Sequence, residues 1–240
     1  LTDNTKYMNR ALPVKKSFDI IERNLIIGGQ NSAFYFIDGF TKDETMLKLM
    51  DSFLNISADD MPEDATSFST SCIPYVEVDI LGDFDSIFKN LLSGVTCLFI
   101  DGYEAAIAID CRTYPSRSIE EPDKDKSLRG SRDGFVETIV FNTALMRRRI
   151  RDPHLIMEMY EAGTSTRTDV ALCYMSDRVD RELLTTIQNK LEESKSQDLK
   201  MSQQSLAEAL FQRKWYNPFP KYKFTERPDT ACACLMEGKV

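Results

Sequence analysis

The chain has 240 residues, of which 42% are hydrophobic and 28% are charged. It is therefore long enough to bury a substantial core, either as one large domain or as two smaller lobes. Its net charge of −8 and pI near 4.9 argue against general nucleic-acid binding, because contact with phosphates requires a basic face. No stretch approaches the roughly 18 apolar residues of a membrane-spanning helix, and the polar first ten residues are not typical of a signal peptide.

The first half of the chain alternates short strands with amphipathic helices. Residues 1–13 are polar and end at Pro13, which predicts a loosely docked arm. Residues 95–109 predict a β-hairpin around Asp101-Gly102, because Asp-Gly favours the tight turn between antiparallel strands. Hydrophobic periodicity predicts the remaining elements in this order: a strand at 33–37, a helix at 42–54, a loop at 55–71, a strand at 75–80 and a helix at 83–92.

A long helical pattern occupies the middle of the chain, within residues 129–152. Its hydrophobic residues, from Phe135 to Ile150, share one face at a rotation of about 100° per residue. Ser131 or Asp133 can cap its N-terminus. Asp152 ends it, because the residue before a proline leaves the α region.

The second half continues the alternation and ends abruptly. The pattern predicts a short helix at 153–161, a buried strand at 169–175, helices at 178–191 and 202–211, and a strand from 230 to 240. Because no partner strand follows the last one, we expect the chain to be part of a longer protein.

These elements predict an α/β fold of two small lobes with mixed sheets, joined near the long central helix. The charged, proline-bearing segment 112–129 is the expected connector between the lobes. We expect an N-terminal arm and lead-in at 1–24, a first lobe at 25–128 and a second lobe at 129–240.

The segment that precedes the central helix is one candidate site. Arg129, Gly130, Arg132 and Gly134 could hold a phosphate or carboxylate with backbone N–H groups at the helix N-terminus. The segment matches neither common nucleotide-binding glycine pattern. Alternatively, the glycines form a tight turn and the arginines pair with carboxylates across a lobe interface.

The arginines at the other end of this helix are the second candidate. Positive charge there suits the negative end of the helix dipole. Arg147, Arg148 and Arg149 could contact anionic lipid or an acidic partner, or form a solvated or interface face. Helical spacing predicts that Arg148 points away from the core and that Arg147 lies on its margin.

No catalytic or metal-binding constellation is present in the sequence. The chain has one histidine, His154, and its six cysteines have no C-x-x-C spacing. We therefore expect reduced, mostly buried cysteines, no metal or other cofactor, and no enzymatic activity.

Four motifs occur along the second half of the chain: Arg129-Gly130-Ser131-Arg132-Asp133-Gly134-Phe135, Asn142-Thr143-Ala144-Leu145 with the run Arg147 to Pro153, Thr168-Asp169-Val170 and Thr225-Glu226-Arg227-Pro228-Asp229. Taken together they resemble the N-terminal soluble domain of the GerA-type spore germination A-subunit family. Three further segments look most like its stage V sporulation AF branch: Lys15-Lys16-Ser17-Phe18-Asp19, Arg112-Thr113-Tyr114-Pro115-Ser116-Arg117-Ser118-Ile119 and Ser131-Arg132-Asp133.

This resemblance implies a two-lobe domain on the cytoplasmic, spore-core side of the inner spore membrane. It implies that a membrane-spanning domain follows, and that the whole protein forms an oligomeric ion-channel-type complex with copies of itself and other germination subunits. The family has no established catalytic residues to carry over. The alternative is a small-ligand (germinant) sensor with a cleft between the lobes near Arg129 and Gly134.

Overall fold

The computed structural model describes residues 1–41, 43–114, 133–195, 203–210 and 222–240. The chain divides into two compact units. The first comprises Leu1–Ser116 together with Arg147–Pro153, and the second comprises Arg117–Met146 together with His154–Val240. Helices and sheets occur in both, which confirms the α/β class.

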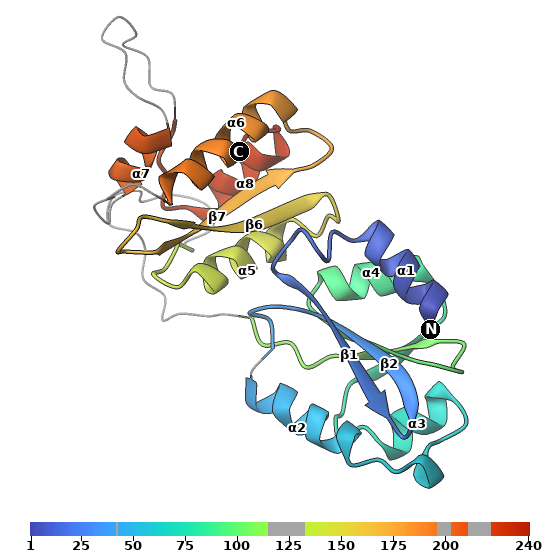
Figure 1. Ribbon diagram of the computed structural model, residues 1–240. Coiled ribbons are helices and arrows are strands. Elements are labelled where there is room, and N and C mark those ends of the chain that lie inside the picture. The colour runs from blue at the N-terminus through green and yellow to red at the C-terminus, as the bar shows by residue number, and fades with distance from the viewer. Residues whose placement is uncertain (42, 115–132, 196–202, 211–221) are drawn as a thin grey trace, which may run out of the picture. The chain divides into compact units, whose positions relative to one another are not determined.

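The first unit is built on a five-stranded antiparallel sheet with the strand order β1-β2-β4-β5-β3 (Figure 1). Strands β4 and β5 are buried along their whole length, and they form the hairpin that the Asp101-Gly102 turn predicted. The strand bounds are β1 Ile20–Ile27, β2 Gln30–Ile37, β3 Val78–Leu81, β4 Thr96–Ile100 and β5 Ala106–Ile109.

Two pairs of helices cover the two faces of this sheet (Figure 1). Phe34 packs against Phe53 of α2, on the face of the sheet that α2 and α3 cover. Its neighbour Tyr35 points to the opposite face, because successive strand residues alternate, and its ring meets Phe99. The helix bounds are α1 Thr2–Ala11, α2 Asp43–Leu54, α3 Ala65–Ser71 and α4 Phe84–Leu92. A short 3₁₀ helix, η1, spans Ala58–Asp60.

The second unit contains a two-stranded antiparallel sheet, β6 (Leu155–Ala162) with β7 (Thr168–Met175). Helix α6 (Arg181–Ser194) packs on one face of it. Its core consists of buried side chains from both elements: Ile156, Leu172, Tyr174, Leu184, Ile187 and Leu191. The other helices are α7 (Gln203–Leu210), α8 (Pro228–Met236) and α5 (Ile139–Arg149), whose last three residues belong to the first unit.

The structure corrects the expectation for the N-terminal segment and for the loop at 55–71. Residues 2–11 form helix α1, and Met8 and Leu12 are buried, so this segment packs as part of the first unit. Helix α3 lies within 55–71, where Asp64 caps it by accepting a hydrogen bond from Ser67 N–H. Serines and threonines fill that helix, and their low helix propensity concealed it.

Two elements of the second unit have the opposite secondary structure to the prediction. Residues 155–162 form a strand, because short apolar runs fit both periodicities and pairing with β7 decides between them. Residues 228–236 form helix α8, with Pro228 in its first turn, where proline is well tolerated. The alternating Ala and Cys residues at 231–234 had suggested a strand.

Two further details differ from expectation. All strand pairs in the described part of the chain are antiparallel, where mixed sheets were expected. The central helix begins at Ile139, after the predicted caps. The side-chain amide of Asn142 holds the extended segment before it, accepting from Val136 N–H at 2.7 Å and donating to Val136 C=O at 2.6 Å.

Gly94 provides a test of packing between α4 and the sheet. Its φ is +99°, and a Cβ there would lie 2.5 Å from Cδ2 of the buried Phe40 ring. We expect Gly94→Ala to lower the free energy of unfolding by about 2–4 kcal/mol, through backbone strain and overpacking together.

Gly102→Ala is the matched control. Gly102 also has a positive φ, +86°, but nothing lies within 4 Å of its added Cβ, so we expect a loss of only about 1–2 kcal/mol. Urea unfolding of both variants measures the difference. Equal losses would contradict the predicted clash.

Candidate functional site

Arg147, in the last turn of α5, is fully buried within the first unit. Its Nε donates to Asp19 Oδ2 at 2.7 Å and its Nη2 to Asp19 Oδ1 at 3.3 Å. The third nitrogen, Nη1, donates to the carbonyl of Asp152 at 3.0 Å. The side chain therefore pairs with a carboxylate in the two-point geometry that arginine favours, but its burial differs from the solvated or marginal position expected.

Arg148 is exposed, as the helical spacing predicted. Its guanidinium carbon lies 4.5 Å from the centre of the Tyr114 ring, within range of a cation–π interaction. The next residue, Arg149, is partly buried. Three consecutive arginines thus occupy three different environments, because each is rotated by about 100° from the last.

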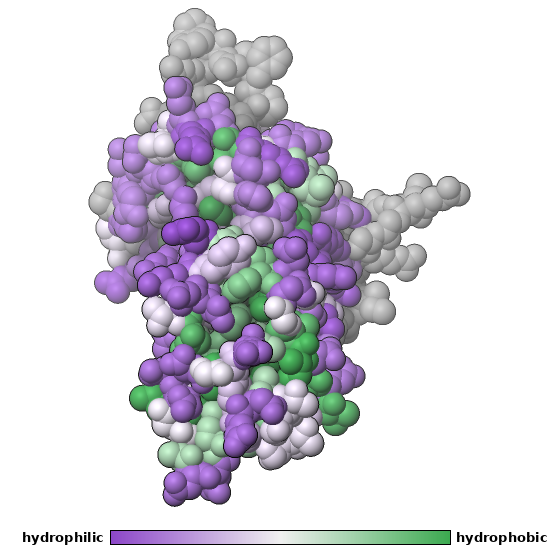
Figure 2. Space-filling model, turned by 90° about the vertical axis from the view of Figure 1, so that its right-hand side faces the viewer, coloured by the Kyte–Doolittle hydropathy of each residue, from purple (hydrophilic) through white to green (hydrophobic). Residues whose placement is uncertain are grey.

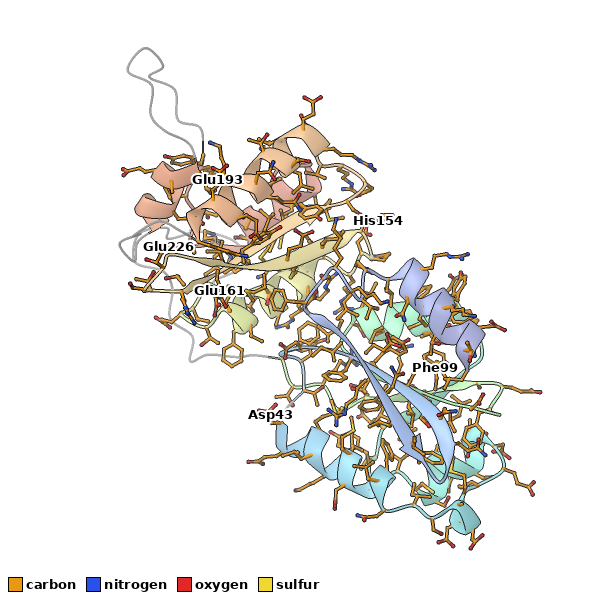
Figure 3. The ribbon with its side chains drawn as sticks, viewed as in Figure 1. Asp43, Phe99, His154, Glu161, Glu193 and Glu226 are labelled. Carbon is orange, nitrogen blue, oxygen red and sulfur yellow. The ribbon has the colours of Figure 1, made fainter. Side chains whose placement is uncertain are left out.

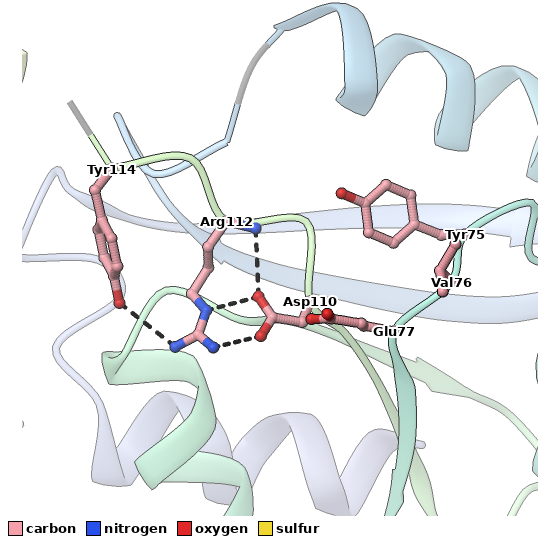
Figure 4. Close-up of a pocket in the computed structure, with 6 residues that line it drawn as sticks. All are labelled: Tyr75, Val76, Glu77, Asp110, Arg112 and Tyr114. Carbon is pink, nitrogen blue, oxygen red and sulfur yellow. Dashed lines mark hydrogen bonds and ion pairs between the residues drawn. The ribbon is translucent and has the colours of Figure 1, made fainter. Parts of the chain in front are cut away.

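Tyr114 belongs to a polar cluster at the end of β5, with Asp110, Arg112 and Ser93. Arg112 Nε donates to Asp110 Oδ1 at 2.6 Å, and a second bond joins its Nη2 to Oδ2 (Figure 4). Its Nη1 donates to Ser93 Oγ at 3.1 Å, and the Tyr114 hydroxyl donates to the Ser93 carbonyl at 2.9 Å. We call these four residues the Asp110 cluster.

Backbone pairing positions the Asp110 cluster. After β5 the chain bridges Arg112 to Thr41, and Thr113 N–H donates to Phe40 C=O at 2.6 Å. Extended backbone places alternate residues on one side, so Asp110, Arg112 and Tyr114 all face the same region. The hydrogen bonds from Arg112 favour the ionised carboxylate and hold the pKa of Asp110 below its ordinary value.

The Asp110 cluster forms one wall of an open pocket of about 580 Å³. The opposite wall is the segment Tyr75, Val76 and Glu77, which leads into β3 (Figure 4). Two tyrosines, two carboxylates and one paired arginine therefore surround the space. This set of groups is suited to binding a polar or cationic ligand. Since Asp110 is held ionised by Arg112, it is a poor proton donor.

The glycine-rich candidate segment is described only in part. Arg129, Gly130 and Arg132 lie outside the described residues, as does the expected cleft near them. Gly134 is buried in the second unit. The adjacent Phe135 N–H donates to the carbonyl of Glu226 at 2.8 Å, which ties together two of the motifs that carried the family resemblance.

Within the described ranges, no group of three His, Cys, Asp or Glu side chains is placed to hold a metal ion. His154 is exposed just before β6, and Glu161 lies at the other end of that strand (Figure 3). All six cysteines lie within the described ranges, and no disulfide joins any two of them. None of the helices described is long and apolar enough to cross a membrane.

Sequence reasoning missed Asp110, Arg112 and Tyr114 as site residues. A signal was present, because Asp-x-Arg-x-Tyr directly follows a strand of buried residues, and alternation at such a point places three functional side chains together. Ser93 and Tyr75 could not be found in this way, because they come from other parts of the chain.

The family model described as Bacillus/Clostridium GerA spore germination protein matches residues 6–240. The chain belongs to the GerA family. This chain is 33% identical over 238 residues to stage V sporulation protein AF of Bacillus subtilis, and the match covers 99% of this chain and 48% of that protein. It is 29% identical over 233 residues to the uncharacterized membrane protein YfkQ of the same organism, covering 96% and 45% respectively.

The fold of the GerA-family domain is also found in a solved structure. The crystal structure of the N-terminal domain of the A subunit of the Bacillus megaterium spore germinant receptor GerK3 matches with a TM-score of 0.67 at 22% identity, covering 99% of this chain and 88% of that one. The chain spans about half the length of the curated relatives that it matches.

The buried ion pair of the first unit predicts unequal effects for two adjacent arginines. We expect Arg147→Met to lower the free energy of unfolding by about 3–5 kcal/mol, because it leaves the Asp19 carboxylate buried without its partner. Arg148→Met should cost less than about 1 kcal/mol, since Arg148 is exposed. Urea denaturation measures both, and similar losses would contradict the predicted cost of burying the Asp19 carboxylate without Arg147.

The Asp110 cluster predicts a dependence of stability on pH. Because the folded-state pKa of Asp110 is lowered, its ionised form stabilises the fold at neutral pH, and this contribution is lost as pH falls through the folded-state value. The pair is partly exposed, so we expect Asp110→Asn to cost about 1 kcal/mol or less at pH 7. The difference from the unsubstituted chain should shrink below the ordinary aspartate pKa of about 4, and a difference independent of pH would contradict this.

Proposed function

We propose that this GerA-family domain is the soluble, cytoplasmic part of a membrane-anchored subunit of a spore germination complex. Its role is structural and regulatory, in an oligomeric assembly of the ion-channel type. The observation that carries this proposal is the family match over residues 6–240 in a chain that spans about half of its relatives. The remaining half of a longer protein would supply the membrane anchor, and one relative is described as a membrane protein.

The chemistry of the described residues supports a role in assembly. In both the Asp110 cluster and the Arg147–Asp19 pair an arginine is already paired with a carboxylate, partly exposed in the first and buried in the second. The Ser17 hydroxyl donates to Asp19 Oδ1 at 2.5 Å, but Ser17, Asp19 and Arg147 are all buried, so a substrate could not reach that hydroxyl as a nucleophile. Arg148 differs, because it is exposed although its guanidinium lies over the partly buried Tyr114 ring, and it is therefore accessible to a partner. We propose Arg148 as a subunit contact.

Fractionation of the full-length protein from spores tests this proposal. We expect it to stay in the membrane pellet through salt and alkaline carbonate washes and to require detergent for release. The released protein should form an oligomer that Arg148→Glu weakens at least tenfold, because reversal of charge replaces attraction by repulsion.

Lys48→Glu provides the control, since Lys48 is an exposed cation on α2 of the same unit. It should leave the oligomer unchanged. Release of the full-length protein by the washes alone would overturn the membrane anchor. Equal assembly of both variants would remove Arg148 from the proposed contact.

A further inference from the structure

Strand β3 forms one edge of the five-stranded sheet, with β5 on its only paired side among the described strands. Asp110 N–H donates to the Glu77 carbonyl at 2.9 Å, so Glu77 directs its backbone groups towards β5. Antiparallel pairs alternate between bonded and non-bonded positions. The N–H and C=O groups of Val78 and Ile80 therefore point away from β5, towards the open edge.

Two apolar side chains are exposed along this edge. Ile80 is 38% exposed, and Val76, two residues before β3, is 97% exposed. Figure 2 shows hydrophobic residues among the polar ones on the surface of the first unit. Exposed edges are commonly protected by lysine, proline or a bulge, because unpaired backbone groups bind other strands. Between Val76 and Leu81 there is no lysine, proline or bulge; the charges on this short strand are carboxylates, which repel an acidic strand but not a basic one.

The charge of this edge has a single sign. From Tyr75 to Phe88 the sequence contains four carboxylates, Glu77, Asp79, Asp83 and Asp85, and no lysine or arginine. Glu77 and Asp79 are exposed and form no ion pair within the described part of the chain. Arg112, the cation that lines the neighbouring pocket, is already paired with Asp110. The edge therefore attracts positive charge.

The pocket beside the Asp110 cluster lies at the end of this edge. Tyr75 and Glu77 line it and lead directly into β3. At about 3.3 Å per residue, a strand paired along β3 would need only five or six residues to reach the pocket. An added strand gains affinity from backbone hydrogen bonds, and adjacent pockets give it specificity through alternate side chains. Tyrosine rings beside a carboxylate suit a lysine or arginine side chain.

We infer that the β3 edge binds an extended, basic segment of a partner protein as an additional strand, with one cationic side chain in the pocket. A second copy of this chain is disfavoured as the occupant through β3-to-β3 pairing. Such pairing would place Glu77 and Asp79 of one copy opposite the same residues of the other, and like charges across strands are destabilising. The inference rests on the edge and its charge, independently of the membrane anchor proposed above.

Binding of synthetic peptides to the 240-residue chain tests this inference. Three fluorescent peptides are compared by anisotropy: one alternating lysine and valine, one alternating glutamate and valine, and the lysine peptide with proline at its central positions. We expect the lysine peptide to bind at least tenfold more tightly than the other two. Its affinity should fall as salt is added, because exposed charges are screened.

Two substitutions at one position separate backbone pairing from side-chain contact. Ile80→Pro removes an N–H that points to the open edge, which an edge strand tolerates, and should weaken binding at least tenfold. Ile80→Thr keeps that N–H and should weaken it less than threefold. Circular dichroism verifies that both variants are folded.

Asp79→Lys keeps the inference testable if the proline variant does not fold. It should shift the preference from the lysine peptide towards the glutamate peptide. Equal binding of the lysine and glutamate peptides, or unchanged binding by folded Ile80→Pro, would overturn the inference. Loss of self-association in Ile80→Pro without any peptide binding would also overturn it, in favour of a second copy as the occupant.

Discussion

The ion pair between Arg147 and Asp19 determines how the chain is organised, because it holds a short internal segment in the first unit. Residues Arg147–Pro153 belong to that unit, while the residues before and after them belong to the second. A buried guanidinium is costly to desolvate. Here all three of its nitrogens have partners, two bonds going to one carboxylate and one to the carbonyl of Asp152. Such a pair is weak evidence for net stabilisation. It does specify a single arrangement of the chain, because any other arrangement would leave one of the two charges buried without its partner.

The sequence predicted those parts of the fold that local patterns determine. The β4–β5 hairpin follows from Asp101-Gly102, and α4 follows from its apolar periodicity. The burial of Arg147 could not be predicted, because its partner Asp19 precedes it by 128 residues. Residues 155–162 illustrate a different limit. Their apolar residues fit helix and strand alike, and only the partner strand β7 decides between the two.

The candidate site was predictable to a similar extent. Helical spacing correctly placed Arg148 outside, and it placed Arg147 at a margin without showing that a carboxylate from the N-terminal segment covers it. The Asp110 cluster combines a local alternation of Asp110, Arg112 and Tyr114 with Ser93, which comes from the end of α4. The alternation is visible in the sequence, whereas the contact with Ser93 depends on the tertiary structure. The pocket depends on both, because its opposite wall leads into β3, which pairs with β5.

The fold can be shared with a solved structure at 22% identity because buried and exposed positions are constrained differently. A buried network tolerates few substitutions, since each group that loses its partner leaves another unsatisfied. An exposed edge has no such constraint, so its charge can change without loss of the fold. In this chain the paired side chains of the Asp110 cluster and the exposed β3 edge meet at Asp110. Its side chain is held by Arg112, while its backbone N–H, bonded to Glu77, sets which groups of β3 face outwards. The backbone pairing of β3 with β5 therefore determines the geometry of the edge, and the exposed carboxylates determine which charge that edge attracts.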